Sequence, residues 1–424
     1  MDLHCSPEDD AFRAEARAWL AAHVPRTPLP SLETREGFAA HRAWEAELRA
    51  DRWSAVSWPK EYGGRGVDLF RWLIFEEEYW AADAPGRVAQ NGISLLAPTL
   101  FGHGSEEQRA RVLPPMASGE TVWAQAWSEP EAGSDLAALR SRADRTAGGW
   151  LLTGRKTWSS RAAFADRAFG IFRTDPGAGA PHRGLTYLMF DLSAPGVTVR
   201  PIGRLDGKPA FAELSLDRVF VPDEDVIGEP GQGWRIAMSA TGNERGLTLR
   251  SPGRFLAAAE RLVREWRAGP APQGPVDGTA LRDPVDGTAA LRDPVDGTAA
   301  LRERVDGTAA LRERVDGTAL RERVADAVIG ARAYQLFTSA AASRLAAGEA
   351  IGAEASLNKV FWSEYDIALH ETALDLLGEE AEFADTAWAE GHLFALAGPV
   401  YAGTNEIQRD IIAERLLGLP KGRR

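Results

Sequence analysis

Three polar segments of the chain combine residue types that could hold a charged or flat ligand. The first covers residues 124–143, AQAWSEPEAGSDLAALRSRA, in which Ser128, Gly133 and Ser134 surround an acidic Glu-Pro pair. A turn rich in glycine and serine presents backbone N–H groups, and such a group of donors suits a phosphate or a polarised heterocycle. The same residues would also form an ordinary turn that leads into a strand, so this segment alone leaves both interpretations open.

The other two segments lie further along the chain. In residues 154–160, GRKTWSS, Trp158 precedes two hydroxyl side chains. Its ring could cover one face of a flat cofactor, or it could be a core tryptophan in a strand. Residues 399–409, PVYAGTNEIQR, form a small polar loop before a helical pattern, and a helix N-terminus favours negative charge. The tip of that loop, around Ala402, offers no acid, base or nucleophile, so the reactive group must come from elsewhere.

Helices are the first elements available to position these segments. Ser6 is a typical N-cap, Pro7 fits the first helical position, and acids follow in the first turn. Apolar residues then recur at helical spacing, and further helices are expected over residues 36–49 and 69–80. The N-terminal part of the chain is therefore predicted to be helical.

Residues 123–225 differ in character from the helical part. Segments rich in β-branched and aromatic residues, such as GLTYLMFDL and FAELSLDRVFVP, alternate with Gly, Pro and Asp at hairpin-like intervals. Helical periodicity returns from Gly233 onward. This order indicates an α+β fold, with an N-terminal helical domain at 1–122, a central antiparallel β domain at 123–230 and a C-terminal helical bundle at 231–424.

A tandem repeat interrupts the C-terminal part. Five near-identical copies of a unit such as PVDGTAALRD follow one another over residues 275–322. A period of about ten with Asp-Gly in every copy suits neither a heptad nor an uninterrupted helix. We expect an insertion in a loop between two helices, because long surface insertions cost little closure entropy. A docking arm is the alternative.

Composition excludes several classes of protein. The 424 residues carry a net charge of −12, which disfavours nucleic-acid binding because phosphate neutralisation needs a basic surface. No apolar run reaches the length of a membrane span and the N-terminus is acidic, so a cytoplasmic location is expected. The single Cys5 and the absence of an H-E-x-x-H pair argue against cysteine-based and hydrolytic zinc sites. Gly231 and Gly233 lack the third glycine of a dinucleotide fingerprint, and we interpret them as a loop before a helix.

Taken in order, these segments resemble the acyl-CoA dehydrogenase family. The resemblance rests on SWPKEYGG, FGHGSEEQRARVLPPMASGE, AQAWSEPEAGSD, TGRKTWSS, DRVFVPDEDVIGEPGQGW and YAGTNEIQRDIIAERLLGLPK, and it spans nearly the whole chain outside the repeat. It implies an N-terminal helical domain, a central β domain and a C-terminal four-helix bundle, with FAD between the β domain and the bundle. It also implies α,β-dehydrogenation of an acyl thioester, acyl-CoA or carrier-bound, in fatty-acid, steroid or secondary metabolism.

The family's cofactor positions carry over residue by residue. Gln125, Ala126, Trp127 and Ser128 match the segment at the pyrimidine side of the flavin, and Trp158 and Ser160 match the pair beside the flavin ring and N5. Ser134, in the turn that holds Gly133, matches a serine near the pyrophosphate and the thioester entrance. Thr404 and Glu406 match positions that line the FAD phosphate region. Ser134 is also expected to contact the substrate. Glu406 stands where some members have glutamine, and its charge disfavours direct contact with a phosphate.

The resemblance also implies where the catalytic base lies. In one large branch of the family a glutamate occupies the position of Ala402, which cannot take a proton. The branch similar to isovaleryl-CoA dehydrogenases carries its base on the first helix of the C-terminal bundle, at the position of Glu244. We expect Glu244 as base, Arg245 beside it as a substrate contact, and the Ala402 backbone N–H as half of the clamp on the thioester carbonyl. Locally, Glu244 could equally be a surface glutamate paired with Arg245.

Departures from the family pattern concern its partners. Most homotetrameric members have an Arg-x-x-Phe-Gly segment that grips the FAD of a neighbouring subunit, whereas this chain has RLVREWRAGPAPQ, and acids follow Gly378. This resembles a bacterial branch, including steroid side-chain dehydrogenases, in which two different chains pair. We expect a homo-oligomer or a heteromer with a related subunit, and an electron-transfer flavoprotein or similar acceptor. A flavin oxidase or monooxygenase on the same fold, or a non-catalytic subunit, are the alternatives.

Overall fold

The N-terminal helices begin at the predicted caps. The computed structural model describes residues 6–245, 251–268, 317–349, 351–382 and 386–422. At the first helix, the Ser6 hydroxyl accepts a hydrogen bond from the Asp9 N–H, and the Asp9 carboxylate accepts one from the Ser6 N–H. This reciprocal box satisfies two donors that a helix start otherwise leaves unpaired. The helices of this part are α1 (Pro7–His23), α2 (Arg35–Ala50), α3 (Leu69–Ala81), α4 (Ala97–His103) and α5 (Glu106–Ala117), with a π-helical turn η2 (Gly92–Leu96) leading into α4.

The central part is a single twisted sheet with strand order β6-β7-β3-β2-β4-β5-β8. Its strands are β1 (Trp123–Ala126), β2 (Arg142–Thr146), β3 (Gly149–Ser160), β4 (Arg167–Arg173), β5 (Leu185–Asp191), β6 (Val197–Ile202), β7 (Phe211–Pro222) and β8 (Val226–Ile227). Most neighbours are antiparallel, as predicted. β1 instead pairs with β4 in parallel, because the β2–β3 hairpin lies between them in the chain and returns it to the same end of the sheet.

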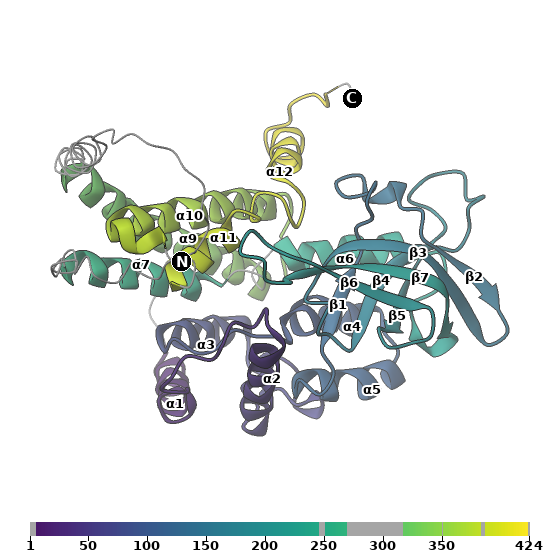
Figure 1. Cartoon of the computed structure of the whole chain (residues 1–424), viewed down its shortest axis with the longest axis horizontal. Helices are drawn as coiled ribbons and strands as arrows, with labels where there is room; N and C mark the ends of the chain where they lie inside the picture. Colours follow the sequence, from purple (N-terminus) through teal and green to yellow (C-terminus); the bar gives the residue numbers. More distant parts are fainter. Residues whose placement is uncertain (1–5, 246–250, 269–316, 350, 383–385, 423–424) are drawn as a thin grey trace, which may run out of the picture.

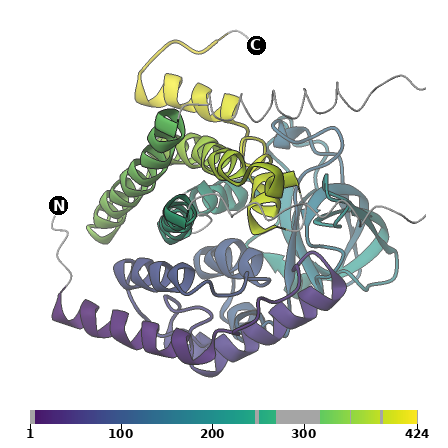
Figure 2. The same ribbon diagram turned by 60° about the vertical axis from the view of Figure 1, so that its left-hand side comes forward.

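Helices return after the sheet, as predicted. They are α6 (Gly233–Arg245), α7 (Pro252–Ala268), α9 (Gly317–Ala346), α10 (Glu354–Leu377), α11 (Ala387–Ala395) and α12 (Asn405–Ile411). In Figure 1, α6 lies beside the sheet and α7 lies between α3 and the longer helices of the bundle. Figure 2 shows α12 at the outer side of the bundle, with the chain beyond it leading outward.

The end of the repeat is helical. α9 begins at Gly317, so residues 317–322 of the repeat are helical, and the prediction of a loop through residue 322 was wrong there. The last copy is followed directly by an apolar helical pattern with no further Asp-Gly, so a helix can extend back into it. The rest of the repeat lies outside the described residues.

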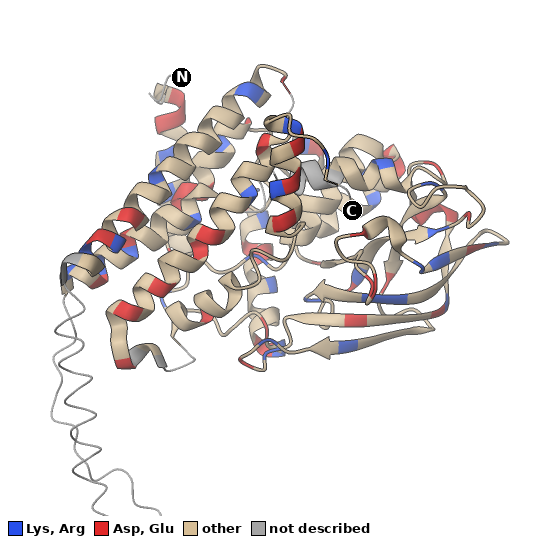
Figure 3. Ribbon diagram, turned by 90° about the horizontal axis from the view of Figure 1, so that it is seen from above, with Lys and Arg blue, Asp and Glu red and all other residues tan. Residues whose placement is uncertain are grey.

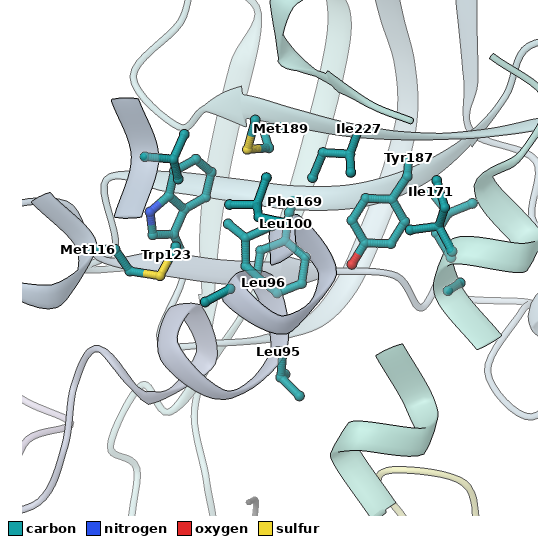
Figure 4. Close-up of a cluster of buried hydrophobic side chains, with 14 of the residues drawn as sticks. Leu95, Leu96, Leu100, Met116, Trp123, Phe169, Ile171, Tyr187, Met189 and Ile227 are labelled. Atoms are coloured by element: carbon teal, nitrogen blue, oxygen red, sulfur yellow. The ribbon is translucent and has the colours of Figure 1, made fainter. Parts of the chain in front are cut away.

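A large apolar cluster joins the N-terminal helices to the sheet. Trp123, Phe169, Tyr187, Met189 and Ile227 extend from the strands toward η2, α4 and α5 (Figure 4). They meet Leu95, Leu96, Leu100 and Met116, all of which are nearly inaccessible to solvent. Because this face of the sheet is covered by helices, the positions of β1, β4 and β5 are fixed relative to the N-terminal part.

Charged residues of both signs are interspersed over the helices in the view of Figure 3. Among the described residues, no helix is long and apolar enough to cross a membrane. The same part of the chain contains no group of three or more His, Cys, Asp or Glu side chains that could hold a metal ion.

Candidate active site

Two of the predicted ligand-binding segments lie side by side at the ends of β1 and β3. The Thr157 N–H donates to the Ser128 carbonyl at 2.9 Å. Beneath them Lys156 is fully buried, and its Nζ donates to the carbonyl of Trp127 at 3.2 Å and to Glu129 Oε1 at 2.9 Å. The tertiary structure therefore brings the segment that ends at Ser128 next to the segment that begins at Thr157.

Glu129 completes this connection. Its carboxylate also accepts from the backbone N–H groups of Arg140 and Ser141, at 2.6 and 2.9 Å. Burial raises the pKa of a carboxyl, but the Lys156 ammonium and these N–H groups hold the pKa of Glu129 below its usual value. The turn that contains Gly133 and Ser134, both exposed, is therefore attached to β3 at its base.

Trp158 is presented to solvent on a strained backbone. Its exposed fraction is 60%, whereas the other tryptophans of the chain are buried or half-buried. Its φ is +58°, in the left-handed region that non-glycine residues seldom adopt, and the β3–β7 register shifts between Lys156 and Ser159. A strained, exposed aromatic at a strand bulge is typical of a ligand contact, so the interpretation as a core tryptophan is wrong.

The C-terminal loop is held by α10. Asn405, at the start of α12, is buried, and its Oδ1 accepts from Lys359 Nζ at 2.7 Å and from Ser363 Oγ at 3.0 Å. Thr404 caps α12 by accepting from the Ile407 N–H. These bonds fix the end of the loop against the bundle.

Gln408 fixes the tip of the same loop. Its Nε2 donates to the carbonyls of Ala402 and Gly403, at 3.0 and 3.3 Å. Ala402 has φ +55°, so the loop tip holds a non-glycine residue in the left-handed region. Among the described residues no acceptor binds the Ala402 N–H, and this donor is available to a ligand. Glu406 is exposed, and hydrogen bonds from its own N–H and the Thr404 hydroxyl lower its carboxyl pKa.

A cavity of about 450 Å³ lies where the three parts of the chain meet. Its walls come from α3, from η2 and the residues before it, from the β domain, and from the first turn of α7 and the length of α11. The charged, hydroxyl and aromatic residues of the wall include Trp72, Glu76, Trp80, Arg87, Arg161, Arg204, Ser251, Arg254, Glu390 and Phe394. Arg161 directly follows Ser160, so the cavity begins where the strand β3 ends.

Arg254 connects this cavity to the C-terminal loop. Its guanidinium forms an ion pair with buried Asp366 at 2.7 Å and lies over the ring of Phe394. Burial lowers the pKa of an arginine, but the negative charge of Asp366 has the larger combined effect and raises the pKa of Arg254. Tyr401, which is nearby, also raises it. The loop that carries Ala402 is therefore close to the cavity wall.

The described residues fit a flat cofactor between the sheet and the bundle. The exposed Trp158 ring and the Ala402 N–H, which has no acceptor among those residues, are the two observations that favour it. Ser128 and Ser160 are half-buried on adjoining segments, and Gln125 is half-buried on β1. Ala126 and Trp127, in contrast, have buried side chains in the core, so only their backbone groups can face a ligand.

Glu244 and Arg245 occupy the last turn of α6. Their side chains lie outside the described part, so their prediction is untested. Sequence reasoning overlooked Lys156, Glu76 and Arg254. The only sequence signal for Lys156 was a lysine within a stretch of β3 that otherwise faces inward. Glu76 and Arg254 had no sequence signal, because the cavity wall is formed by residues that are distant in the chain.

Comparison with protein-family models identifies all three parts. The acyl-CoA dehydrogenase N-terminal, middle and C-terminal domains match residues 6–120, 124–219 and 298–417. The first two ranges contain the N-terminal helices and most of the sheet, and the third contains α11 and the loop of Ala402.

Known proteins match over most of the chain. Acyl-CoA dehydrogenase IpdE1 of Mycobacterium tuberculosis is 33% identical, over 97% of this chain and 98% of that protein. Isovaleryl-CoA dehydrogenase of Solanum tuberosum is 32% identical over 49% of this chain and 51% of its own. The crystal structure of the ChsE4–ChsE5 complex from Mycobacterium tuberculosis superposes with a TM-score of 0.75 at 28% identity and covers 100% of both chains.

These matches confirm the predicted fold, the FAD cofactor and the dehydrogenation of acyl-CoA. The chain belongs to the acyl-CoA dehydrogenase family, whose members are FAD-dependent oxidoreductases.

Proposed function

We propose that Glu244 is the catalytic base for removal of the α-proton of the acyl thioester. The observation that carries this proposal is the loop tip, where Ala402 supplies no acid and its N–H has no acceptor among the described residues. Glu244 lies in the last turn of α6, seven residues before Ser251 in the cavity wall. A carboxylate at this position would approach the reacting carbon from the side of the pocket where Ser251 and Arg254 lie.

The Ala402 N–H would act on the thioester carbonyl. A hydrogen bond at that oxygen stabilises the negative charge that develops as the α-proton leaves, which is the main way a site can assist removal of a weakly acidic C–H proton. Gln408 fixes the neighbouring carbonyls, so this N–H is oriented before the substrate arrives. FAD, when bound, supplies the acceptor for the β-hydride. Arg245 and Ser134 would contact the substrate.

The flavin would be held by the two joined strand ends and the C-terminal loop. The proposed contacts are backbone groups of Ala126 and Trp127 with the side chains of Gln125, Ser128 and Ser160, the ring of Trp158, the turn of Gly133 and Ser134, and Thr404 with Glu406 nearby. Lys156 supports these contacts from below without facing the ligand.

A substitution at Glu244 tests the assignment of the base. Glu244→Gln keeps the shape of the side chain but removes its ability to take a proton, so the variant should bind FAD normally while acyl-CoA no longer reduces the flavin. The measurement is loss of flavin absorbance on anaerobic addition of acyl-CoA, with FAD content determined on the same sample. Flavin reduction at the wild-type rate in Glu244→Gln would overturn the assignment. Glu229, an acid of the loop before α6, provides the control variant Glu229→Gln, which should behave as wild type.

We also propose that the chain pairs with a related subunit in the cytoplasm and passes its electrons to an electron-transfer flavoprotein. Apolar side chains exposed on α9 and α10, Ile329, Phe337 and Phe361 among them, support a partner surface. The similar ChsE4–ChsE5 structure is a complex of two proteins, which also supports pairing.

The FAD content of the chain tests this pairing. The chain purified alone should hold less than one FAD per chain, and co-expression with its partner should restore full content. One FAD per chain and full turnover without a partner would contradict this proposal.

A further inference from the structure

Glu76 differs from the other charged groups of the cavity wall. Two arginines there are already paired: Arg87 with Glu45 at 2.9 Å, and Arg254 with Asp366 at 2.7 Å. Glu76 has no ion-pair partner among the described residues. Its Oε2 accepts a long hydrogen bond of 3.3 Å from Trp80 Nε1, and the Ser251 hydroxyl also hydrogen-bonds to its carboxylate.

Aromatic side chains adjoin Glu76 in the cavity. Glu76 is half-buried, and it lines the cavity wall. Burial is the largest influence on its carboxyl and raises its pKa, although the Arg87 charge acts in the opposite direction. Aromatic rings of α3, including Trp72 and Trp80, line the cavity beside it.

An unsubstituted alkyl chain fits this wall poorly. It would remove water from Glu76 and Ser251 and return no hydrogen bond, which is unfavourable for any buried polar group. A second carboxylate would be repelled by Glu76, and the arginines of the wall would not offset this because each already pairs with an acid, Arg161 with Glu33 and Arg204 with Asp206. An ammonium group would lose far more hydration than a hydroxyl on entering the cavity. A neutral hydroxyl avoids both costs and can donate to the Glu76 carboxylate.

We propose that the acyl group bound by this site carries a hydroxyl group beyond the reacting carbons, held by Glu76 and Ser251. Glu76 is thus a specificity-determining residue in the same cavity wall as Arg161, which follows the end of β3. This inference rests on the proposed function, because it treats the cavity as the acyl pocket of the dehydrogenase.

A matched set of thioesters tests it with the FAD-loaded full-length chain. The set contains a saturated acyl-CoA and its ω-hydroxy, ω-carboxy and ω-amino counterparts with the same number of carbons. The wild type should use the ω-hydroxy compound with a kcat/KM at least about tenfold above the saturated one, mostly through a lower KM, since one hydrogen bond to a charged group is worth at least that factor. Glu76→Leu should reverse this preference.

Two further variants keep the experiment decisive if Glu76→Leu folds poorly. Glu76→Gln keeps the shape and a hydrogen-bonding oxygen, so it should retain part of the preference. Glu77→Gln changes the next residue of α3, which pairs with Arg13 on another side of the helix, and it should leave the preference intact. Equal or better use of the saturated compound by the wild type, or an unchanged preference in both Glu76 variants, would overturn the inference while the dehydrogenase function stands. Failure of every thioester to reduce the flavin would instead overturn the proposed function and this inference with it.

Discussion

At the scale of single residues, Lys156 shows how a buried charge can support a binding segment. Its ammonium donates to Glu129 and to the carbonyls of Trp127 and Ile171, so all three of its protons have acceptors. A buried ion pair that is fully hydrogen-bonded can be tolerated, but removal of one member leaves the other charge without compensation.

Lys156→Met should therefore be severely destabilising. The variant leaves the Glu129 carboxylate buried without its cation, and we expect a loss of about 3–5 kcal/mol in the free energy of unfolding. The urea midpoint of the purified chain measures it. Replacement of Glu129 by Gln in the same variant should recover part of the loss. Arg142→Met on β2, which removes an exposed pair with Asp144, should change stability by less than about 1 kcal/mol and serves as the control.

At the scale of elements, the close approach of α3 and α7 shapes the cavity. A Cβ added to Gly253 would lie 2.6 Å from the carbonyl oxygen of Glu76, so the two helices touch through backbone at this point. The contact places Ser251, which precedes α7, and Arg254 of α7 in the same cavity wall as Glu76 of α3. Only glycine allows the helices to approach so closely.

Gly253→Ala should separate these two helices. The added methyl group has no room, and we expect a cost of about 1–3 kcal/mol in the free energy of unfolding together with weaker acyl-CoA binding, because the cavity wall moves. Gly102→Ala is the matched control: it is also a glycine in a helix, α4, but nothing lies within 4 Å of the added Cβ. That variant should be neutral or up to about 1 kcal/mol more stable. Equal effects of the two variants would refute a steric role for Gly253.

At the scale of the whole molecule, Glu390 ties the three parts together. This residue of α11 accepts from the Ser31 hydroxyl at 2.9 Å, in the N-terminal part, and from Arg204 and Lys208 of the β domain, at 3.2 and 3.3 Å. Burial raises its pKa, but the Ser31 hydroxyl and the two cations outweigh burial, so the pKa of Glu390 is lowered. One carboxylate thus links segments more than 180 residues apart in the chain.

This linkage predicts a dependence on pH. Because the pKa of Glu390 is lower in the folded state, its ionised carboxylate contributes to the free energy of unfolding. This contribution is complete at pH values above the unfolded-state pKa of about 4.3 and is lost as the pH falls below that value. Glu390→Gln should reduce the urea midpoint at neutral pH, by an amount that corresponds to about 1 kcal/mol for this partly exposed group. The difference from wild type should shrink as the pH is lowered from about 6 to about 3. A difference that stays constant over this range would show that ionisation of Glu390 is not involved.

The sequence by itself determined the order of elements and the family. Capping residues predicted the start of α1, alternation predicted the sheet, and GRKTWSS and YAGTNEIQR marked two candidate binding segments, because each signal is local and needs only neighbouring residues. Membership of the family then supplied FAD. The parallel pairing of β1 with β4 was not predictable in this way, since it joins segments distant in the chain. The helical end of the repeat does have a local signal in the apolar pattern that follows it, and the prediction missed it.

The tertiary structure alone decided the roles of the three glutamates in FEEEY. In sequence Glu76, Glu77 and Glu78 are equivalent, but successive helical residues point about 100° apart. Glu78 therefore meets Arg13 and Arg17 of α1, at 2.8 Å each, whereas Glu76 faces the cavity with no cation paired to it in the described structure. The physical reason is that charge pairing depends on which distant helix covers each face, and this is fixed only when α1, α3 and α7 pack together.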